Sequence, residues 1–250
     1  MQRLGSVFFT GFLFVWTFLV AVVFATAALF LPFEKRFVFP RFWAASLLTM
    51  LRWTCHLDYT VEGQENIPPG AHVALWKHAS TWETLAMNVV FPRQAWVLKR
   101  ELRWLPVVGW CIQLLHAIAI NRKNRGQAVN QIIEQGQKRL EEGSWVMIFP
   151  EGTRMPFGTT RRYGVSGALL ASKTGRLVVP VAHNAGYYWP RRYVMKKPGT
   201  IRVVIGTPIE TAGRNPREIN EEVQNWIEGQ MKLLGPVIGH NAQDSGGARS

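Results

Sequence analysis

Apolar residues fall into two long N-terminal blocks, followed by shorter runs that alternate with amphipathic segments. Residues 4–33 carry no charge, and as a helix rising about 1.5 Å per residue they would exceed the roughly 30 Å apolar thickness of a bilayer. The run could span with tilt, form a re-entrant hairpin or be a cleaved signal peptide, but its length favours a retained membrane segment. Residues 42–57 are interrupted by Arg52. They are expected to lie on the bilayer or beside the first helix, with burial in the core as the alternative.

Beyond residue 57 the pattern alternates between strand-like and helix-like segments. Short apolar runs predict strands at residues 72–76, 95–98, 117–120, 145–149, 177–182 and 201–205. Helical spacing predicts helices at residues 80–90, 126–142, 165–173 and 216–234. Such alternation predicts an α/β fold with a mixed, largely parallel sheet flanked by helices. We expect membrane-anchoring helices in residues 1–57, the α/β domain in residues 58–234 and a disordered tail in residues 235–250.

The charge balance narrows the class of partner. A net charge of +13 favours anions, and nucleic acid, an anionic membrane surface and a phosphorylated substrate are all compatible with it. The apolar N-terminus makes the membrane surface the better partner and weighs against nucleic acid. Lys35, Arg36 and Arg41 follow the first apolar run and place the following domain on the cytosolic face of the membrane. The two cysteines lack metal-binding spacing, which agrees with a reduced compartment.

A histidine and a carboxylate follow the first strand of the α/β region. His78 comes two positions after the end of the apolar run of residues 71–76, and Glu83 lies five positions later. A histidine whose ring is held by a carboxylate can serve as a general base. Ser80 and Glu83 also form a Ser-x-x-Glu capping box, which opens helices without any catalytic role. Because five helical positions would turn the two side chains apart, His78 is expected to precede the helix, with Ser80 as its N-cap.

Cationic and glycine-containing segments follow other predicted strands. Residues 149–154 have the sequence Phe-Pro-Glu-Gly-Thr-Arg, and the carboxyl ends of strands are where α/β folds place their ligands. In this loop Arg154 could grip a phosphate, and Glu151 could accept hydrogen bonds from hydroxyl groups. Lys99 and Arg122 stand after two further strand-like runs. Taken alone, each of these charges is better explained as a solvated surface group than as a phosphate ligand.

Together, the order and spacing of these segments resemble the glycerolipid acyltransferase family, the 1-acyl-sn-glycerol-3-phosphate acyltransferases. The family's first block is His, four residues and Asp, and this chain has His78 with Glu83 in place of the aspartate. An apolar strand ending in Arg122, the unchanged Phe-Pro-Glu-Gly-Thr-Arg block and the Val-Pro-Val of residues 179–181 match the other three. The segment from Lys99 resembles the family's lysine region. The likeness covers about residues 58–210.

The resemblance implies roles for the matching residues. His78 would take the proton from a lysophospholipid hydroxyl that attacks an acyl thioester of coenzyme A or acyl carrier protein, and Glu83 would support the imidazole. The expected acceptor is lysophosphatidic acid, and the product phosphatidic acid. The substrate-binding residues implied are Lys99, Arg122, Glu151, Gly152, Thr153 and Arg154. No cofactor and no metal site are implied.

Other functions stay open at the level of sequence. A different lysolipid acceptor is compatible with the same motifs, and so is a binding protein that has lost its chemistry. A serine hydrolase or thioesterase would use Ser166 in Gly-Val-Ser-Gly-Ala, a near match to a nucleophile elbow that lacks the final glycine. His183 lies in an apolar run and is expected to be a core or strand-end histidine.

Overall fold

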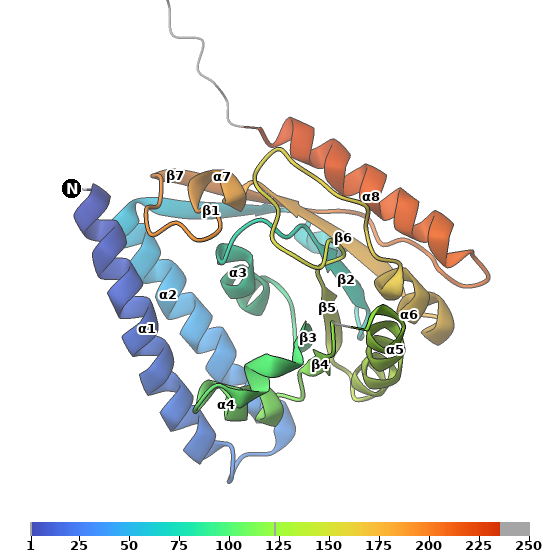
Figure 1. Ribbon diagram of the computed structural model, residues 1–250, viewed down its shortest axis with the longest axis horizontal. Coiled ribbons are helices and arrows are strands. Elements are labelled where there is room, and N and C mark those ends of the chain that lie inside the picture. The colour runs from blue at the N-terminus through green and yellow to red at the C-terminus, as the bar shows by residue number, and fades with distance from the viewer. Residues whose placement is uncertain (1, 123, 236–250) are drawn as a thin grey trace, which may run out of the picture.

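The computed structural model describes residues 2–122 and 124–235. Its centre is a seven-stranded sheet in the order β1-β7-β6-β2-β5-β3-β4, with helices on both faces (Figure 1). The strands are β1 Leu57–Glu62, β2 Val73–Trp76, β3 Gln94–Lys99, β4 Ile118–Ile120, β5 Trp145–Ile148, β6 Val178–His183 and β7 Gly199–Ile205. Neighbouring strands are parallel except for β6 and β7. The mixed, largely parallel sheet predicted from the sequence is confirmed.

The helices agree with the predicted pattern and add to it. They are α1 Gln2–Ala27, α2 Val38–Cys55, α3 Trp82–Val90, α4 Val108–Leu114, α5 Arg125–Glu141, α6 Ser166–Thr174, α7 Ala185–Tyr188 and α8 Pro216–Leu233. The prediction did not include β1, α4 or α7. Strand β1 is a half-exposed edge strand, and its alternating apolar and polar residues directly follow the longer apolar run of α2.

The central strands are buried because helices cover both faces of the sheet. All four residues of β2 are buried. Val73 and Leu75 belong to the core shared with α5, α6 and α8, whereas Ala74 and Trp76 belong to the core shared with α2 and α3. Strands covered on both faces appear in sequence as uninterrupted apolar runs, which is why the short runs predicted strands correctly.

Pro180 occupies a place in the sheet that the sequence did not suggest. A proline inside a strand is expected at an edge or a bulge, yet β6 lies between β7 and β2. The residues that follow β7 interrupt the pairing of β6 at this position. Gly206 N donates a hydrogen bond to Pro180 O, and the next pair of the ladder joins Val178 to Ile209. The missing N–H of Pro180 therefore falls at a gap in the ladder on the β7 side.

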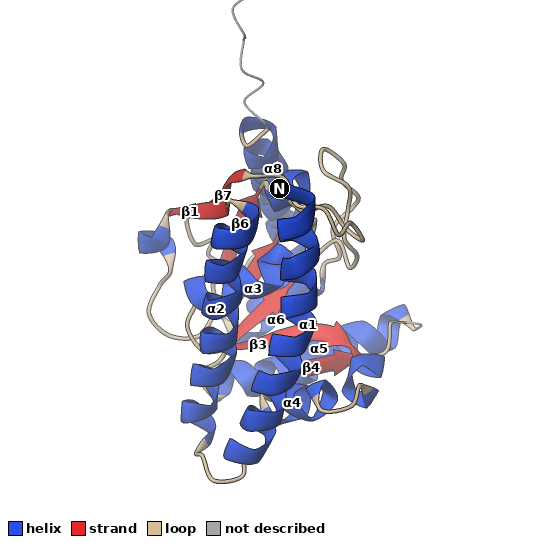
Figure 2. Ribbon diagram, turned by 90° about the vertical axis from the view of Figure 1, so that its left-hand side faces the viewer, coloured by secondary structure: helices blue, strands red, loops and turns tan. Residues whose placement is uncertain are grey.

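The two N-terminal helices form a hairpin against one face of the domain (Figures 1 and 2). Helix α1 has 26 residues and is long and apolar enough to cross a membrane, a test that a core helix or a signal sequence also passes. Helix α2 packs beside α1, and its Leu47 and Leu51 are fully buried in the core beneath the sheet. The second apolar stretch, which forms most of α2, thus packs beside α1 and also contributes to the core. The expected disordered tail falls, from residue 236 onward, outside the described residues.

Candidate active site

The segments singled out in the sequence meet at one edge of the sheet. Strands β2, β5, β3 and β4 are neighbours and run parallel, so their carboxyl ends lie together. His78 follows β2, residues 149–154 follow β5, Lys99 ends β3 and Arg122 follows β4. This edge is where open α/β sheets bind ligands.

His78 and Glu83 form a hydrogen-bonded pair. His78 lies in the turn between β2 and α3, and its Nδ1 is 2.7 Å from Oε1 of Glu83, the second residue of α3. The longer glutamate side chain therefore reaches the imidazole, because the histidine precedes the helix as expected. The Glu83 carboxylate also accepts hydrogen bonds from the backbone N–H groups of Ser80, at 2.8 Å, and Ala79, at 3.2 Å.

Helix capping and support of the histidine thus coincide in one carboxylate. Ser80 Oγ accepts a hydrogen bond from Trp82 N at 3.1 Å, while Glu83 accepts from Ser80 N. The helix begins at Trp82, with Thr81 rather than the expected Ser80 as its N-cap residue. Glu83 therefore acts both as a partner of the His78 ring and as a capping residue of α3.

The charge on Glu83 fixes the tautomer of His78. Burial raises the pKa of Glu83, but the hydrogen bond from His78 and electrostatic interactions with the side chains of His183, His78 and Arg154 outweigh burial and hold that pKa below its usual value. Glu83 is therefore an ionised acceptor at neutral pH, so His78 Nδ1 carries a proton and donates the 2.7 Å hydrogen bond. Its Nε2, which has no hydrogen-bond partner among the described residues, is then free to accept a proton.

Phe149 connects the histidine to an apolar cavity. Its ring stacks on that of His78 at 3.9 Å between centroids. It also lines a cavity of about 290 Å³ between the N-terminal hairpin, α3, β3 and α4. The walls are mostly apolar, with Val20, Phe24, Trp43, Met87, Trp96, Ile112 and Leu115 among them. A long apolar ligand in this cavity would have one end beside His78.

A buried charge network holds the backbone of His78. Lys77 is 1% exposed, and its Nζ lies 2.7 Å from Glu151 Oε1 and 2.8 Å from Glu228 Oε1. The other oxygen of Glu151 accepts from His78 N at 2.6 Å. Glu228 also accepts a hydrogen bond from the Tyr163 hydroxyl at 2.7 Å. Glu151, for which the resemblance implies a contact with the substrate, is buried in this network, and both of its oxygens accept hydrogen bonds.

Sequence reasoning did not identify Lys77 or Glu228 as part of the site. A lysine adjoining a buried apolar strand is a signal for Lys77, because an unpaired buried ammonium is costly. Glu228 lies on α8, far away in sequence, and carries no such signal. His183 is a fully buried strand-end residue as predicted, and its Nε2 lies 2.8 Å from Lys77 O and 3.9 Å from Glu83 Oε2. Burial lowers the pKa of His183 more than Glu83 raises it, so its imidazole is neutral.

The remaining predicted residues differ in their surroundings. Gly152 has a φ of 68°, a conformation that favours glycine, and its carbonyl accepts from Arg122 Nη1 at 2.8 Å. Arg154 is half-buried, and its Nε is enclosed without a hydrogen-bond partner among the described residues. Lys99 is exposed at the end of β3, and Thr153 is half-buried in the loop.

The structure does not give Ser166 the setting of a nucleophile elbow. Ser166 is the first residue of α6, and the residues that precede it form a loop rather than a strand. In the described part of the chain no hydrogen bond joins Ser166 to a histidine. Across the same residues, no group of three or more His, Cys, Asp and Glu side chains is placed to hold a metal ion.

The carboxyl edge of an α/β sheet thus places a hydrogen-bonded histidine–carboxylate pair beside an apolar cavity, an arrangement suited to acid–base chemistry on an apolar substrate. Residues 58–184 match the sequence profile of the family described as Acyltransferase. The chain is 41% identical over 211 residues to the 1-acyl-sn-glycerol-3-phosphate acyltransferase of Pseudomonas aeruginosa, which covers 83% of this chain and 82% of that protein. The chain belongs to the acyltransferase family, as the four motifs indicated.

More distant relatives agree with this assignment. The chain is 28% identical over 177 residues to the 1-acyl-sn-glycerol-3-phosphate acyltransferase alpha of Mus musculus, covering 69% of this chain and 62% of the mouse protein. A crystal structure titled 1-acyl-sn-glycerophosphate (LPA) acyltransferase, PlsC, from Thermotoga maritima superimposes with a TM-score of 0.77 at 24% identity. It covers 94% of this chain and 98% of that one. At this level of identity the superposition shows a common fold.

Proposed function

We propose that the protein transfers a fatty acyl group from an acyl thioester to the free hydroxyl of lysophosphatidic acid, which gives phosphatidic acid. The observation that carries this proposal is the position of Phe149, which lines the apolar cavity and stacks on His78. An acyl chain in the cavity would place its carbonyl near the free Nε2 of the histidine. The names of the relatives in Pseudomonas and mouse support the same acceptor.

The proposed reaction needs no covalent enzyme intermediate. His78 Nε2 takes the proton from the acceptor hydroxyl as its oxygen attacks the thioester carbonyl. The tetrahedral intermediate then collapses, the C–S bond breaks, and the imidazolium returns the proton to the departing thiolate. Glu83 stays ionised throughout and stabilises the imidazolium through Nδ1, while Phe149 holds the ring from one face.

Arg154 is the cation best placed for the acceptor's phosphate. Its unpaired, enclosed Nε indicates a guanidinium that lacks an anionic partner, and arginine binds phosphate in a two-pronged fork. Lys99 and Arg122 stand at the ends of neighbouring strands on the same edge and would add positive charge. Glu151 would act through Lys77 and the backbone of His78, in place of the direct glycerol contact that the resemblance implied.

Surface properties support an anionic donor carrier and a location at the membrane. Coenzyme A and acyl carrier protein are both anionic, and Arg191, whose Nη1 contacts Arg154 O at 3.4 Å, extends the positive surface beside the site. The apolar face of α1 supports association with an anionic membrane, and the basic residues after it support a catalytic domain on the cytosolic side.

Purified protein given a panel of lysophospholipids with acyl-coenzyme A or acyl carrier protein donors, read by product mass, tests the proposal. Phosphatidic acid should be the main product, and His78→Ala should abolish its formation while the protein stays folded. His56→Ala, a change at an exposed histidine beside edge strand β1, which two strands separate from β2, serves as the matched control. A different acylated product would show that another lysolipid is the acceptor. Absence of product with every combination of acceptor and donor would exclude the enzyme function.

A further inference from the structure

The segment between β3 and β4 exposes large apolar side chains away from the site. It comprises a short 3₁₀ turn, Arg100–Trp104, and helix α4; we call residues 100–114 the elbow. Trp104 is 85% exposed, Trp110 58% and Leu105 47%. Clustered exposed apolar groups on a folded surface indicate a contact with another apolar phase, and tryptophan is the residue type enriched at membrane interfaces.

The elbow continues the apolar face of the N-terminal hairpin. Cys111 Sγ lies 3.4 Å from Ala21 O of α1, and Arg36 Nη1 donates to Leu114 O at 3.3 Å. Figures 1 and 2 show α4 beside the end of α1 that leads into the hairpin turn. Near that turn Phe30 is 87% exposed, and along α1 further apolar side chains are exposed: Phe14, Val15, Phe18, Leu19, Val22 and Val23. Elbow and hairpin therefore present neighbouring apolar surfaces.

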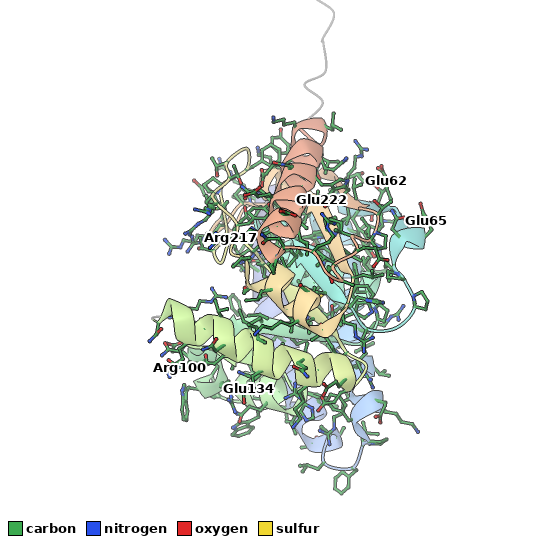
Figure 3. All side chains as sticks on the ribbon, turned by 90° about the vertical axis from the view of Figure 1, so that its right-hand side faces the viewer. Glu62, Glu65, Arg100, Glu134, Arg217 and Glu222 are labelled. Atoms are coloured by element: carbon green, nitrogen blue, oxygen red, sulfur yellow. The ribbon has the colours of Figure 1, made fainter. Side chains whose placement is uncertain are left out.

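Charge around the elbow suits anionic headgroups. Arg100 and Arg103 are exposed within it, and basic side chains beside an apolar surface are attracted to anionic lipid. The side of the molecule seen in Figure 3 has mixed charge: α5 and α8 cover it, with Glu134, Arg217 and Glu222 on these helices, and Arg100 of the elbow lies near α5. A bilayer against the elbow and hairpin would leave these polar helices in water.

The inner side of the elbow forms part of the cavity wall. Leu102, Val108 and Ile112 line the cavity, so the segment separates the proposed acyl site from the exposed tryptophans. Val107 has a φ of 62°, and Val108 N donates to Pro106 O at 2.6 Å in a three-residue turn. A β-branched residue in this conformation is strained, and such strain concentrates in functional segments.

We propose that the elbow is a second bilayer contact, in which Trp104, Leu105 and Trp110 enter the lipid interface beside α1. This inference rests on the proposed function insofar as both need a membrane. Contact at the elbow sets the outer wall of the cavity against the lipid, so that an acyl chain reaches His78 without crossing water.

Site-specific fluorescence tests this contact in the full chain. Trp104→Cys and Leu105→Cys carry an environment-sensitive label, with Leu233→Cys on α8 as the exposed control; the native Cys55 and Cys111 are buried. The proteins are reconstituted into phosphatidylethanolamine–phosphatidylglycerol vesicles with brominated acyl chains. Bromine should quench the labels at 104 and 105 at least twofold more strongly than the label at 233, and aqueous iodide should show the reverse order.

A functional comparison separates this inference from the proposed function. The variant Trp104→Ser/Trp110→Ser should lose at least fivefold in kcat/KM on vesicle-borne lysophosphatidic acid and keep wild-type kcat/KM on a short-chain soluble acceptor. If the protein is active in vesicles but iodide quenches the labels at 104 and 105 as strongly as the label at 233, the elbow contact alone is overturned. Protein that fails to enter vesicles would overturn the elbow contact together with the proposed membrane location, whereas loss of activity on the soluble acceptor would overturn the proposed acyl transfer. Quenching that depends on protein concentration without lipid would assign the surface to a second copy and overturn the bilayer contact.

Discussion

Replacing Lys77 with methionine keeps a long apolar side chain but removes the ammonium that lies 2.7 Å from Glu151 and 2.8 Å from Glu228. The Glu151 side chain has no exposed surface, so its charge would remain buried without this partner. Removal of one member of a buried ion pair costs about 3–5 kcal/mol. Since 1 kcal/mol shifts the midpoint of a chain of this length by roughly 2–4 °C, the thermal midpoint should fall by roughly 6–20 °C.

The loss should depend on pH in a definite direction. Burial raises the pKa of Glu151, and the hydrogen bonds from Lys77 and His78 N offset burial only in part. Removal of Lys77 raises that pKa further. A group whose pKa is higher in the folded than in the unfolded state stabilises the fold below its unfolded pKa and loses that contribution as pH rises through the folded pKa. The deficit of Lys77→Met should therefore be smaller at about pH 5 than at about pH 8.

Thermal unfolding at one scan rate, in one detergent and at both pH values, measures these effects. Lys77→Met/Glu151→Gln should recover most of the lost midpoint, because the second change removes the stranded charge. Arg202→Met is the matched control: its pair with Glu62 is 2.9 Å long but about half exposed, and such pairs contribute about 0–1 kcal/mol. If Lys77→Met lowers the thermal midpoint no more than Arg202→Met does, or if the losses of the two single changes add in Lys77→Met/Glu151→Gln, the stabilising role of the buried network is refuted.

Three further changes test the site. Glu83→Asp should lower kcat at least about tenfold with the fold retained, because a carboxylate one methylene shorter cannot hold His78 Nδ1 and cap α3 together; wild-type kcat in steady-state assays would contradict this. Arg154→Lys should raise the KM for lysophosphatidic acid more than it lowers kcat, since the ammonium loses the fork; an unchanged KM would move the phosphate elsewhere. Ile112→Trp should shift donor preference to shorter chains by roughly fourfold in kcat/KM per excluded methylene, from about 0.8 kcal/mol each. An unaltered chain-length profile would separate the cavity from the acyl group.

The sequence predicted the sheet well because its central strands are covered on both faces. Runs such as β2 and β5 are apolar throughout, and short runs of this kind between amphipathic helices are typical of buried parallel strands. Strand β1 escaped prediction because one face is partly solvated and the strand sits at an edge. Pro180 suggested an edge or bulge, but it lies in a central strand. This position is possible because the pairing on the β7 side is interrupted beside it.

The site was predictable where its residues are close in sequence. His78 and Glu83 meet across one turn, so spacing and helix geometry were enough to suggest their contact. The direction in which Glu151 points was not predictable, because it depends on Lys77 after β2 and on Glu228 of α8, which only the folded chain brings together. A motif locates its residues at the site without showing whether each one faces the ligand or the scaffold.

His78 is therefore held at three points by groups of different origin. Glu83 fixes the ring through Nδ1, Phe149 covers one ring face, and Glu151 holds the backbone N–H. The proposed role of His78 as a general base would benefit from such fixed geometry, since reorientation of the ring would add to the barrier. Glutamate at position 83 suits this arrangement, because its reach lets one buried charge serve the imidazole and the start of α3 together. Glu83 thus keeps the pairing with His78 while its carboxylate, carried on the second residue of α3, also caps the start of that helix.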